Sequence, residues 1–382
     1  MLFGKPHSFL GIDLGAGGVK LVELKTEKHR PVLFTYAVTT DGQDVHRLLH
    51  ESVNTPEEGK KQNQAKVKEY AAVLKAVCAR ANAKSKNAVV SLPVSSVFHA
   101  LVTLPAAKKE DFDHFLKAEV KKLLPYPLEE AVLDYQILPG EEKATTKRVL
   151  VNAVPRDLVV FYTEVFAEAG LKLEALEPES VALARSLIGR DQSVTMLVDV
   201  GAERTNFFII DGGVPITHHS TEVGGNRLTA IFKNIWQVDS AAAEILKMDL
   251  FTELTRGSNH AAVSPDPSAV PLRPRSEASE ASRFKALTLP VVDPILKEIQ
   301  YGFEVYLKQS GNEQKRPEKV VLTGGAAFLP YLSEQIAANF KIKCFIGDPW
   351  GRVLYQDRLK PILRAVGPRL AVAIGLALRS MV

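Results

Sequence analysis

Two glycine turns that lie far apart in the chain share one pattern: each follows an apolar strand and opens with an aspartate. The first is Asp13 in GIDLGAGGVKLVEL, residues 11–24, and the second is Asp199 in DVGAERT, residues 199–205. In both, the apolar run resumes after the turn, which is typical of a β-hairpin. One such turn is a common way to end a strand. Two in matching context predict a chain of two similar halves whose hairpins face each other.

The residues within these turns suit a phosphate ligand. Glycine permits positive φ and lets bare backbone N–H groups approach an oxyanion. A strand-end aspartate can hold Mg²⁺ through its water shell, because this ion prefers carboxylate and water oxygens. Lys20 can reach a phosphate as a point charge, and Thr205 can add a hydroxyl hydrogen bond. Facing hairpins of this kind would clamp a triphosphate between the two halves.

A third glycine turn, Gly324-Gly325, follows the apolar strand KVVLT and precedes a helix. Such a turn can lay flat backbone against a nucleotide base or ribose. Each turn taken alone is equally an ordinary β-turn, so the prediction of a nucleotide site depends on all three together.

Composition limits the alternatives. The chain has 382 residues, 46% of them apolar and 24% charged, which is typical of a soluble globular protein with two or three domains. The net charge of +4 is too small to favour nucleic acid. The two distant cysteines, Cys78 and Cys344, indicate neither a disulfide framework nor a zinc site.

The same features predict a cytoplasmic protein. The N-terminal residues lack the apolar core of a signal peptide. No run approaches the roughly 18–20 apolar residues of a spanning helix. The most apolar stretch near the end, AVAIGLAL at 371–378, is too short. We therefore expect any association with a membrane to go through a partner.

Hydrophobic periodicity predicts the order of the elements. In the first half we expect strands at 9–14, 19–24, 32–39 and 87–93 and a helix at 65–81. A βαββα insertion follows, with strands at 98–105, 133–138 and 147–155 and helices at 108–124 and 156–170. The second half has three strands within 195–221, helices within 226–247 and at 290–310 and 328–340, a strand at 319–325 and a closing helix. The Ser- and Pro-rich segment 257–283 is expected to be disordered.

The order of the three glycine turns resembles the actin/Hsp70/sugar-kinase superfamily, and the insertion resembles the 1C subdomain of FtsA. Four stretches look like the PilM family of type IV pilus assembly: LLPYPLEEAVLDYQIL (123–138), EPESVALAR (177–185), VGGNRLT (223–229) and AAAEILK (241–247). The resemblance implies an α/β, actin-like ATPase fold, with two RNase H-like halves around a nucleotide cleft. One departure is Ala16-Gly17-Gly18 in place of a Ser-rich turn, which removes a hydroxyl but keeps the backbone N–H groups.

The resemblance also implies a division of the chain. Subdomain 1A comprises 1–96 and 172–193, with the 1C insertion at 97–171 between them. Subdomain 2A comprises 194–229 and 317–382 with the closing helix, and subdomain 2B comprises 230–316 and includes the segment 257–283.

Roles in binding ATP follow from the resemblance. Asp13 and Asp199 would orient the waters of Mg²⁺. The phosphates would be surrounded by Gly15, Gly17, Gly18, Lys20, Gly201 and Thr205, and the adenosine would lie against Gly324 and Gly325. Glu244 and Lys247 would reach the ribose or base, and Gly224 and Gly225 would start a helix that faces the nucleotide. A solvated i,i+3 pair and a simple helix start remain open for these last four.

Hydrolysis also needs a group that positions the attacking water. Glu177 and Glu179 are candidates for this catalytic role, although each is equally a carboxylate favoured by the start of a helix. The resemblance implies that ATP is a structural or switching ligand with slow or no hydrolysis.

The partner implied by the family is the cytoplasmic N-terminal tail of a PilN-like bitopic inner-membrane protein. Pro125, Tyr126, Pro127 and Tyr135 would line its groove in the insertion, unless the tyrosines are ordinary packing residues. The chain would then be peripheral to the inner membrane through its partners, with self-association possible.

Two other functions fit the same fold. One is an FtsA-like membrane-associated filament protein, although the last residues lack the basic polar face of a membrane-targeting helix. The other is a sugar-kinase-type phosphotransferase, which would need a catalytic aspartate and a polar substrate pocket. The related GspL of type II secretion continues into a transmembrane helix, whereas this sequence ends at Val382.

Overall fold

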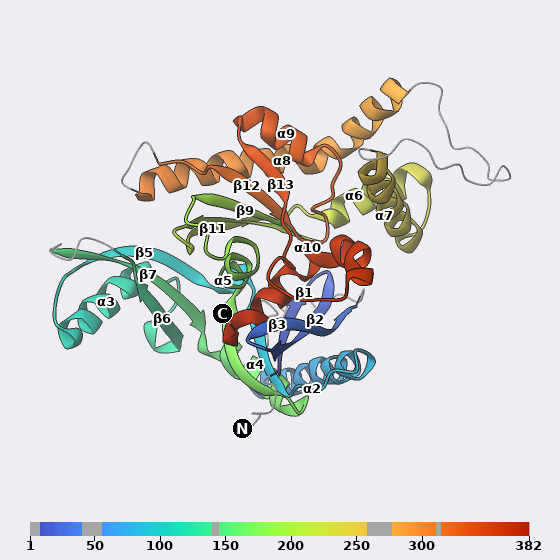
Figure 1. Cartoon of the computed structure of the whole chain (residues 1–382). Helices are drawn as coiled ribbons and strands as arrows, with labels where there is room; N and C mark the ends of the chain where they lie inside the picture. The colour runs from blue at the N-terminus through green and yellow to red at the C-terminus, as the bar shows by residue number, and fades with distance from the viewer. Residues whose placement is uncertain (1–7, 40–55, 140–144, 258–276, 311–314, 382) are drawn as a thin grey trace.

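The computed structural model describes residues 8–39, 56–139, 145–257, 277–310 and 315–381 (Figure 1). Two five-stranded sheets dominate it. The first has the order β3-β2-β1-β4-β8 and the second β11-β10-β9-β12-β13. In each, three strands form an antiparallel meander and two more add in parallel. The two halves therefore repeat one topology, and each predicted hairpin joins the first two strands of its sheet.

The strands of the first sheet are β1 (Ser8–Gly15), β2 (Gly18–Glu27), β3 (Arg30–Val38), β4 (Asn87–Leu92) and β8 (Lys172–Pro178). Those of the second are β9 (Thr195–Val200), β10 (Thr205–Asp211), β11 (Val214–Thr221), β12 (Lys319–Thr323) and β13 (Lys343–Ile346). The edge strands β8 and β13 were not predicted: β8 has only three apolar residues before its proline, and β13 is four residues long.

Helices α2 (Pro56–Arg80) and α4 (Arg156–Glu168) cover one face of the first sheet. Tyr70 of α2 packs edge to face on Phe161 of α4, with ring centroids 5.6 Å apart. Helix α2 begins nine residues before the predicted start at 65, because its first turns are polar and give no periodic signal.

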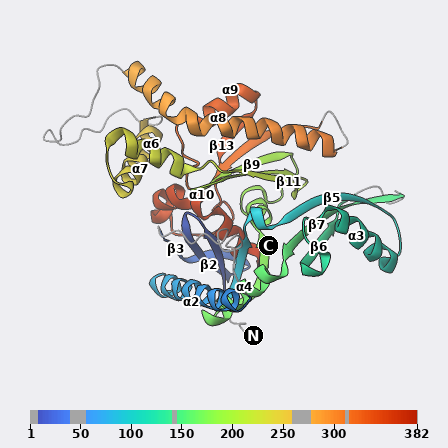
Figure 2. The same ribbon diagram turned by 180° about the vertical axis from the view of Figure 1, so that it is seen from behind.

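The insertion is smaller than predicted. It contains β5 (Phe98–Pro105), α3 (Lys109–Leu123), β6 (Ala131–Ile137) and β7 (Thr146–Pro155), and its sheet has the antiparallel order β5-β7-β6. Figures 1 and 2 show it projecting to one side of the two halves. The prediction assigned the helix at 156–170 to the insertion, but Tyr162 and Phe166 pack into the core of the first half.

In the second half, α6 (Gly225–Trp236), α7 (Ser240–Gly257), α8 (Glu277–Ser310) and α9 (Leu332–Phe340) accompany the sheet. The prediction of disorder at 257–283 is wrong at both ends, since α7 reaches Gly257 and α8 begins at Glu277. The rest of that segment, 258–276, lies outside the described residues.

Helix α10 (Lys360–Ala377) passes between the two halves. It packs against the short helix α5 (Glu179–Leu183), which follows β8. A Cβ at Gly11 of β1 would lie 1.9 Å from the Ala373 carbonyl, so helix and strand meet backbone to backbone. The helical stretch Asp357–Ser380 is long and apolar enough to cross a membrane, with a mean hydropathy of 1.5. This corrects the prediction that no such run exists. Because 67% of its most apolar window is buried inside the protein, it is accounted for as a core helix.

Candidate functional site

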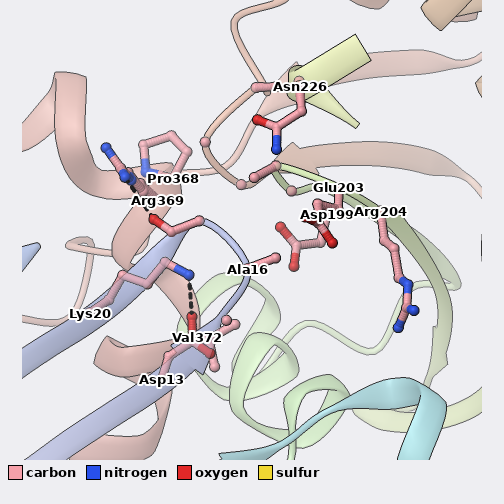
Figure 3. A pocket seen from close by; sticks show the side chains of 18 of the residues that line it. Asp13, Ala16, Lys20, Asp199, Glu203, Arg204, Asn226, Pro368, Arg369 and Val372 are labelled. Atoms are coloured by element: carbon pink, nitrogen blue, oxygen red, sulfur yellow. Dashed lines mark hydrogen bonds and ion pairs between the residues drawn. The ribbon is translucent and has the colours of Figure 1, made fainter. Parts of the chain in front are cut away.

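A cavity of about 210 Å³ lies between the two halves. Both aspartate–glycine hairpins line it, together with the Gly324-Gly325 turn, the helices α6 and α7, and α10 (Figure 3). Twelve of the predicted ligand-binding and catalytic residues meet here: Asp13, Gly15, Gly17, Lys20, Glu179, Asp199, Gly201, Gly225, Glu244, Lys247, Gly324 and Gly325.

The first hairpin brings its own pair of charges. Asp13 lies directly opposite Lys20 in the β1–β2 register, so both side chains leave the same face of the sheet. Their Oδ2 and Nζ atoms are 3.1 Å apart, and the Ser91 hydroxyl of β4 donates to the other Asp13 oxygen at 3.0 Å. Both charged side chains are buried. The lysine is thus held at the cavity wall by its ion pair with Asp13.

The second hairpin presents Asp199, opposite Asn206 in the β9–β10 register. The Asn206 amide donates to Oε2 of Glu179 at 3.1 Å. Burial, followed by the charge of Asp13, raises the pKa of Asp199 to about 7, and Lys20 opposes the shift. Burial raises the pKa of Glu179 well above its usual value, and Asp13 and Asp199 add to this.

Among the residues that the structure describes, five carboxylates line this cavity, including Asp13, Glu179 and Asp199, against four cationic side chains. A divalent cation would add positive charge beside these three, and carboxylate oxygens fit Mg²⁺. Within the described part of the chain, no three Asp, Glu, His or Cys side chains are close enough to hold a metal ion directly. Asp13 and Asp199 would therefore hold such an ion through its waters.

The glycine turns bring backbone close to these carboxylates. Gly324 has φ +92°, and a Cβ there would lie 2.4 Å from Oδ1 of Asp199. A Cβ at Gly17 would lie 3.3 Å from that of Ala202, so the two hairpin turns nearly touch across the cavity. At Gly324 only a residue without a side chain allows this approach.

Glu244 and Lys247 of α7 form an ion pair at 2.6 Å in the cavity wall. Thr229 of α6 donates to Glu244 at 2.7 Å and accepts from Lys247 at 2.9 Å. Burial acts to raise the pKa of Glu244, but the hydrogen bonds from Lys247 and Thr229 hold it below its usual value. Burial lowers the pKa of Lys247 against the opposing effect of Glu244. The pair is thus built into the site, and the solvated surface pair left open above does not describe it.

Four predicted residues lie outside the lining: Gly18, Thr205, Gly224 and Glu177. The fully buried Thr205 hydroxyl donates to the Val223 carbonyl at 2.6 Å. It therefore stabilises the loop before α6 and is not directed at a phosphate. Glu177 accepts from Arg185 at 2.8 Å and from Arg379 at 2.6 Å. These two arginines engage both of its oxygens, which removes Glu177 as a candidate for positioning water.

The predicted partner residues all lie in the insertion, away from the cavity. Pro125 and Pro127 are exposed between α3 and β6. The Tyr135 hydroxyl donates to Asp113 of α3 at 3.1 Å, whereas the buried hydroxyl oxygen of Tyr126 has no hydrogen-bond partner among the described residues.

Sequence reasoning missed several cavity residues, among them Ser95, Arg204, Asn206, Asn226 and Arg369. Asn206 could have been predicted, because a hairpin register places it opposite Asp199. Arg369 was not, because it enters from a helix that lies 352 positions after the loop it contacts.

The family model of the type IV pilus assembly protein PilM matches residues 11–257 and 276–381. This chain belongs to the PilM family. A solved PilM-PilN type IV pilus biogenesis complex is similar to this PilM-family chain over 98% of both chains, with a TM-score of 0.73 and 21% identity. That likeness confirms the predicted actin-like ATPase fold.

Two further solved structures have lower scores. The ethanolamine utilization protein EutJ from Carboxydothermus hydrogenoformans is 17% identical, with a TM-score of 0.48 over 98% of this chain and 91% of that one. MreB5 of Spiroplasma citri bound to ADP is 13% identical, with a TM-score of 0.47 over 97% of this PilM-family chain and 94% of its own.

Proposed function

We propose that this chain is an ATP-binding scaffold of the type IV pilus inner-membrane assembly complex. It works in the cytoplasm and is peripheral to the membrane through a PilN-like partner. The observation that carries the nucleotide site is the meeting of Asp13, Lys20 and Asp199 at one cavity, from hairpins of two repeated halves. Membership of the PilM family supports the place of the protein in pilus assembly.

In this proposal each group has a task. Lys20 and the backbone N–H groups of the two hairpin turns bind the phosphates, and Glu244 with Lys247 holds the ribose or base beside the Gly324-Gly325 turn. Mg²⁺ supplies positive charge between the phosphates and the buried carboxylates.

The slow hydrolysis in this proposal concerns Glu179, the one predicted catalytic carboxylate that lines the cavity. Its Oε2 accepts from the Asn206 amide at 3.1 Å, so one of its oxygens is already engaged in the ligand-free protein. In this proposal ATP acts as a ligand that holds the two halves together rather than as a fuel.

Nucleotide titration tests the site. We expect Lys20→Ala and Asp13→Ala to weaken Mg·ATP binding at least about tenfold, since each removes a charged contact from a buried site. Lys75→Ala is the matched control, because Lys75 is an exposed residue of α2 with a single surface ion pair at 3.4 Å. Isothermal titration calorimetry measures all three. Wild-type affinity in either site variant would refute the nucleotide site.

The partner proposal rests on the insertion. Strand β6 is an edge strand of its sheet, so its free backbone groups can accept an added peptide strand. Val132 and Ile137 of β6 and Phe115 of α3 are exposed apolar side chains. The solved relative that is a PilM-PilN complex supports this choice of partner.

Peptide binding tests the partner. The probe is a fluorescent peptide with the cytoplasmic N-terminal sequence of a PilN-like protein, and anisotropy measures its binding. We expect Tyr126→Ala to weaken binding about tenfold or more, as truncation of an aromatic contact residue does at an interface. Tyr126→Phe should bind as the wild type does, because the hydroxyl oxygen is buried. Tyr301→Ala on α8 is the control, because Tyr301 is 53% exposed in the other half. Equal affinity in all variants would place the groove elsewhere.

A further inference from the structure

Two consecutive residues of α10, Pro368 and Arg369, line the cavity and form hydrogen bonds to both halves. The Pro368 carbonyl accepts hydrogen bonds from the Gly324 N–H and from the Thr323 hydroxyl, both at 3.0 Å. Arg369 faces the other half, where its Nη2 donates to the Gly17 carbonyl at 2.9 Å and to the Thr39 carbonyl at 3.4 Å. The first hairpin turn is therefore attached to the same helix as the Gly324-Gly325 turn.

The rest of the Arg369 guanidinium has no such partner. Arg369 lines the cavity, as Figure 3 shows, and both of its hydrogen bonds use Nη2. Among the described residues, no carboxylate oxygen lies within 4.0 Å of this cation. Its aliphatic stem rests over Gly325, where a Cβ would lie 3.8 Å from Cγ of the arginine. Burial lowers the pKa of Arg369, and the charge of Glu244 partly offsets this.

A half-buried cation that faces a cavity and has N–H groups without a protein acceptor among the described residues is suited to bind an oxyanion. Charge-assisted hydrogen bonds from arginine to phosphate are among the strong ones, and the planar fork can bind two oxygens at once. The position of Arg369 also selects which phosphate it meets. Its Nη2 donates to the Gly17 carbonyl of the first hairpin, and its stem lies against Gly325 of the turn predicted to meet the adenosine.

We propose that Arg369 binds the phosphate nearest the ribose of a bound nucleoside diphosphate or triphosphate. In this arrangement Nη2 stays on the Gly17 carbonyl, and Nη1 and Nε donate to the phosphate oxygens. The same side chain then joins the ligand, the first hairpin and α10. The assignment rests on the nucleotide site proposed above and adds a residue to it.

The experiment compares Mg·ADP with adenosine, which lacks the phosphate, by calorimetry on the full chain. We expect Arg369→Gln to weaken Mg·ADP binding by about 10- to 100-fold and to leave adenosine binding within twofold. Arg369→Lys keeps the charge without the fork, so it should recover part of the loss. Arg364→Gln is the matched control, because Arg364 is an exposed arginine of the same helix.

The outcomes separate the two proposals. Unchanged Mg·ADP affinity in Arg369→Gln overturns the assignment alone, and so does an equal loss for ADP and adenosine, which would mean that Arg369 only supports the loop or the base. Thermal unfolding of each variant without ligand shows whether the fold is intact. Should the wild-type chain fail to bind Mg·ADP at all, the nucleotide site falls, and this assignment with it.

Discussion

Asp13 and Asp199 occupy equivalent positions in two repeated hairpins, but their neighbours differ. The residue opposite Asp13 is Lys20, whereas the residue opposite Asp199 is the neutral Asn206. Asp13 thus has a lysine directly opposite as its counter-charge, whereas Asp199 has only the more distant charge of the same lysine. This asymmetry explains why burial and the charge of Asp13 raise the pKa of Asp199 to about 7.

Two isosteric substitutions should therefore change stability in opposite directions. We expect Asp199→Asn to raise the free energy of unfolding of the ligand-free protein by about 1–2 kcal/mol at pH 8, because an unfavourable buried charge is removed. Asp13→Asn should lower it by about 3 kcal/mol, because Lys20 is left buried without its partner. Urea unfolding measures both.

The same pair separates stability from binding. Both variants should bind Mg·ATP more weakly than the wild-type chain, so Asp199→Asn would be more stable and less functional, as is common where charges are held for a ligand. A loss of stability in Asp199→Asn similar to that in Asp13→Asn would contradict the account of the asymmetry.

At the scale of elements, a histidine contact joins the insertion to the second half. His99 of β5 lies within hydrogen-bond distance of the Ile216 carbonyl of β11, at 3.0 Å, and its other ring nitrogen is 2.8 Å from Asn152. Its ring packs on His218 of β11 with centroids 4.6 Å apart. His219 beside it stacks on Phe207 and is held by Glu298 of α8.

This contact predicts a pH dependence of folding. Burial, then the nearby His99 and His219, lower the pKa of His218 to about 3 from an ordinary 6.5. Between these two values the unfolded chain takes up a proton that the folded chain refuses. The contribution to stability is therefore complete above pH 6.5 and is lost progressively as the pH falls toward 3, by at most about 1.4 kcal/mol per unit.

Substitution isolates that contribution. We expect His218→Gln to flatten the decline of unfolding free energy between pH 6.5 and 4.5, whereas His114→Gln, at an exposed position on α3, should leave the slope unchanged. Urea unfolding at half-unit pH steps gives the slopes. Parallel curves for His218→Gln and the wild type would show that another group causes the decline.

For the molecule as a whole, local signals predicted most of the architecture. Alternating apolar residues and glycine turns indicated both hairpins and the strands of the insertion, because those patterns act over a few residues. They could not indicate that the helix at 156–168 returns to the first half, since its apolar face would fit either sheet. The edge strands β8 and β13 are defined by their partners rather than by their own sequence.

The candidate site divides in the same way. That Asp13, Lys20 and Asp199 line the cavity could be predicted, because each belongs to a hairpin whose glycine turn is visible in the sequence. Thr205 and Glu177 were misassigned because residue type does not reveal which protein group a side chain binds. Thr205 binds a backbone carbonyl, and Glu177 binds two arginines. Arg369 depends on a long-range approach that no local pattern contains.

The backbone-to-backbone seat of α10 on Gly11 has a consequence for biosynthesis. A ribosome releases β1 long before it releases α10, and Gly17 and the arginine that holds it are 352 positions apart. Until that helix arrives, one face of the first sheet, including Val22 and Leu24, stays open to water. Contacts of such separation are slow to close and expose apolar surface meanwhile. The first half therefore cannot complete its core until α10, the last helix of the described chain to be synthesised, has left the ribosome.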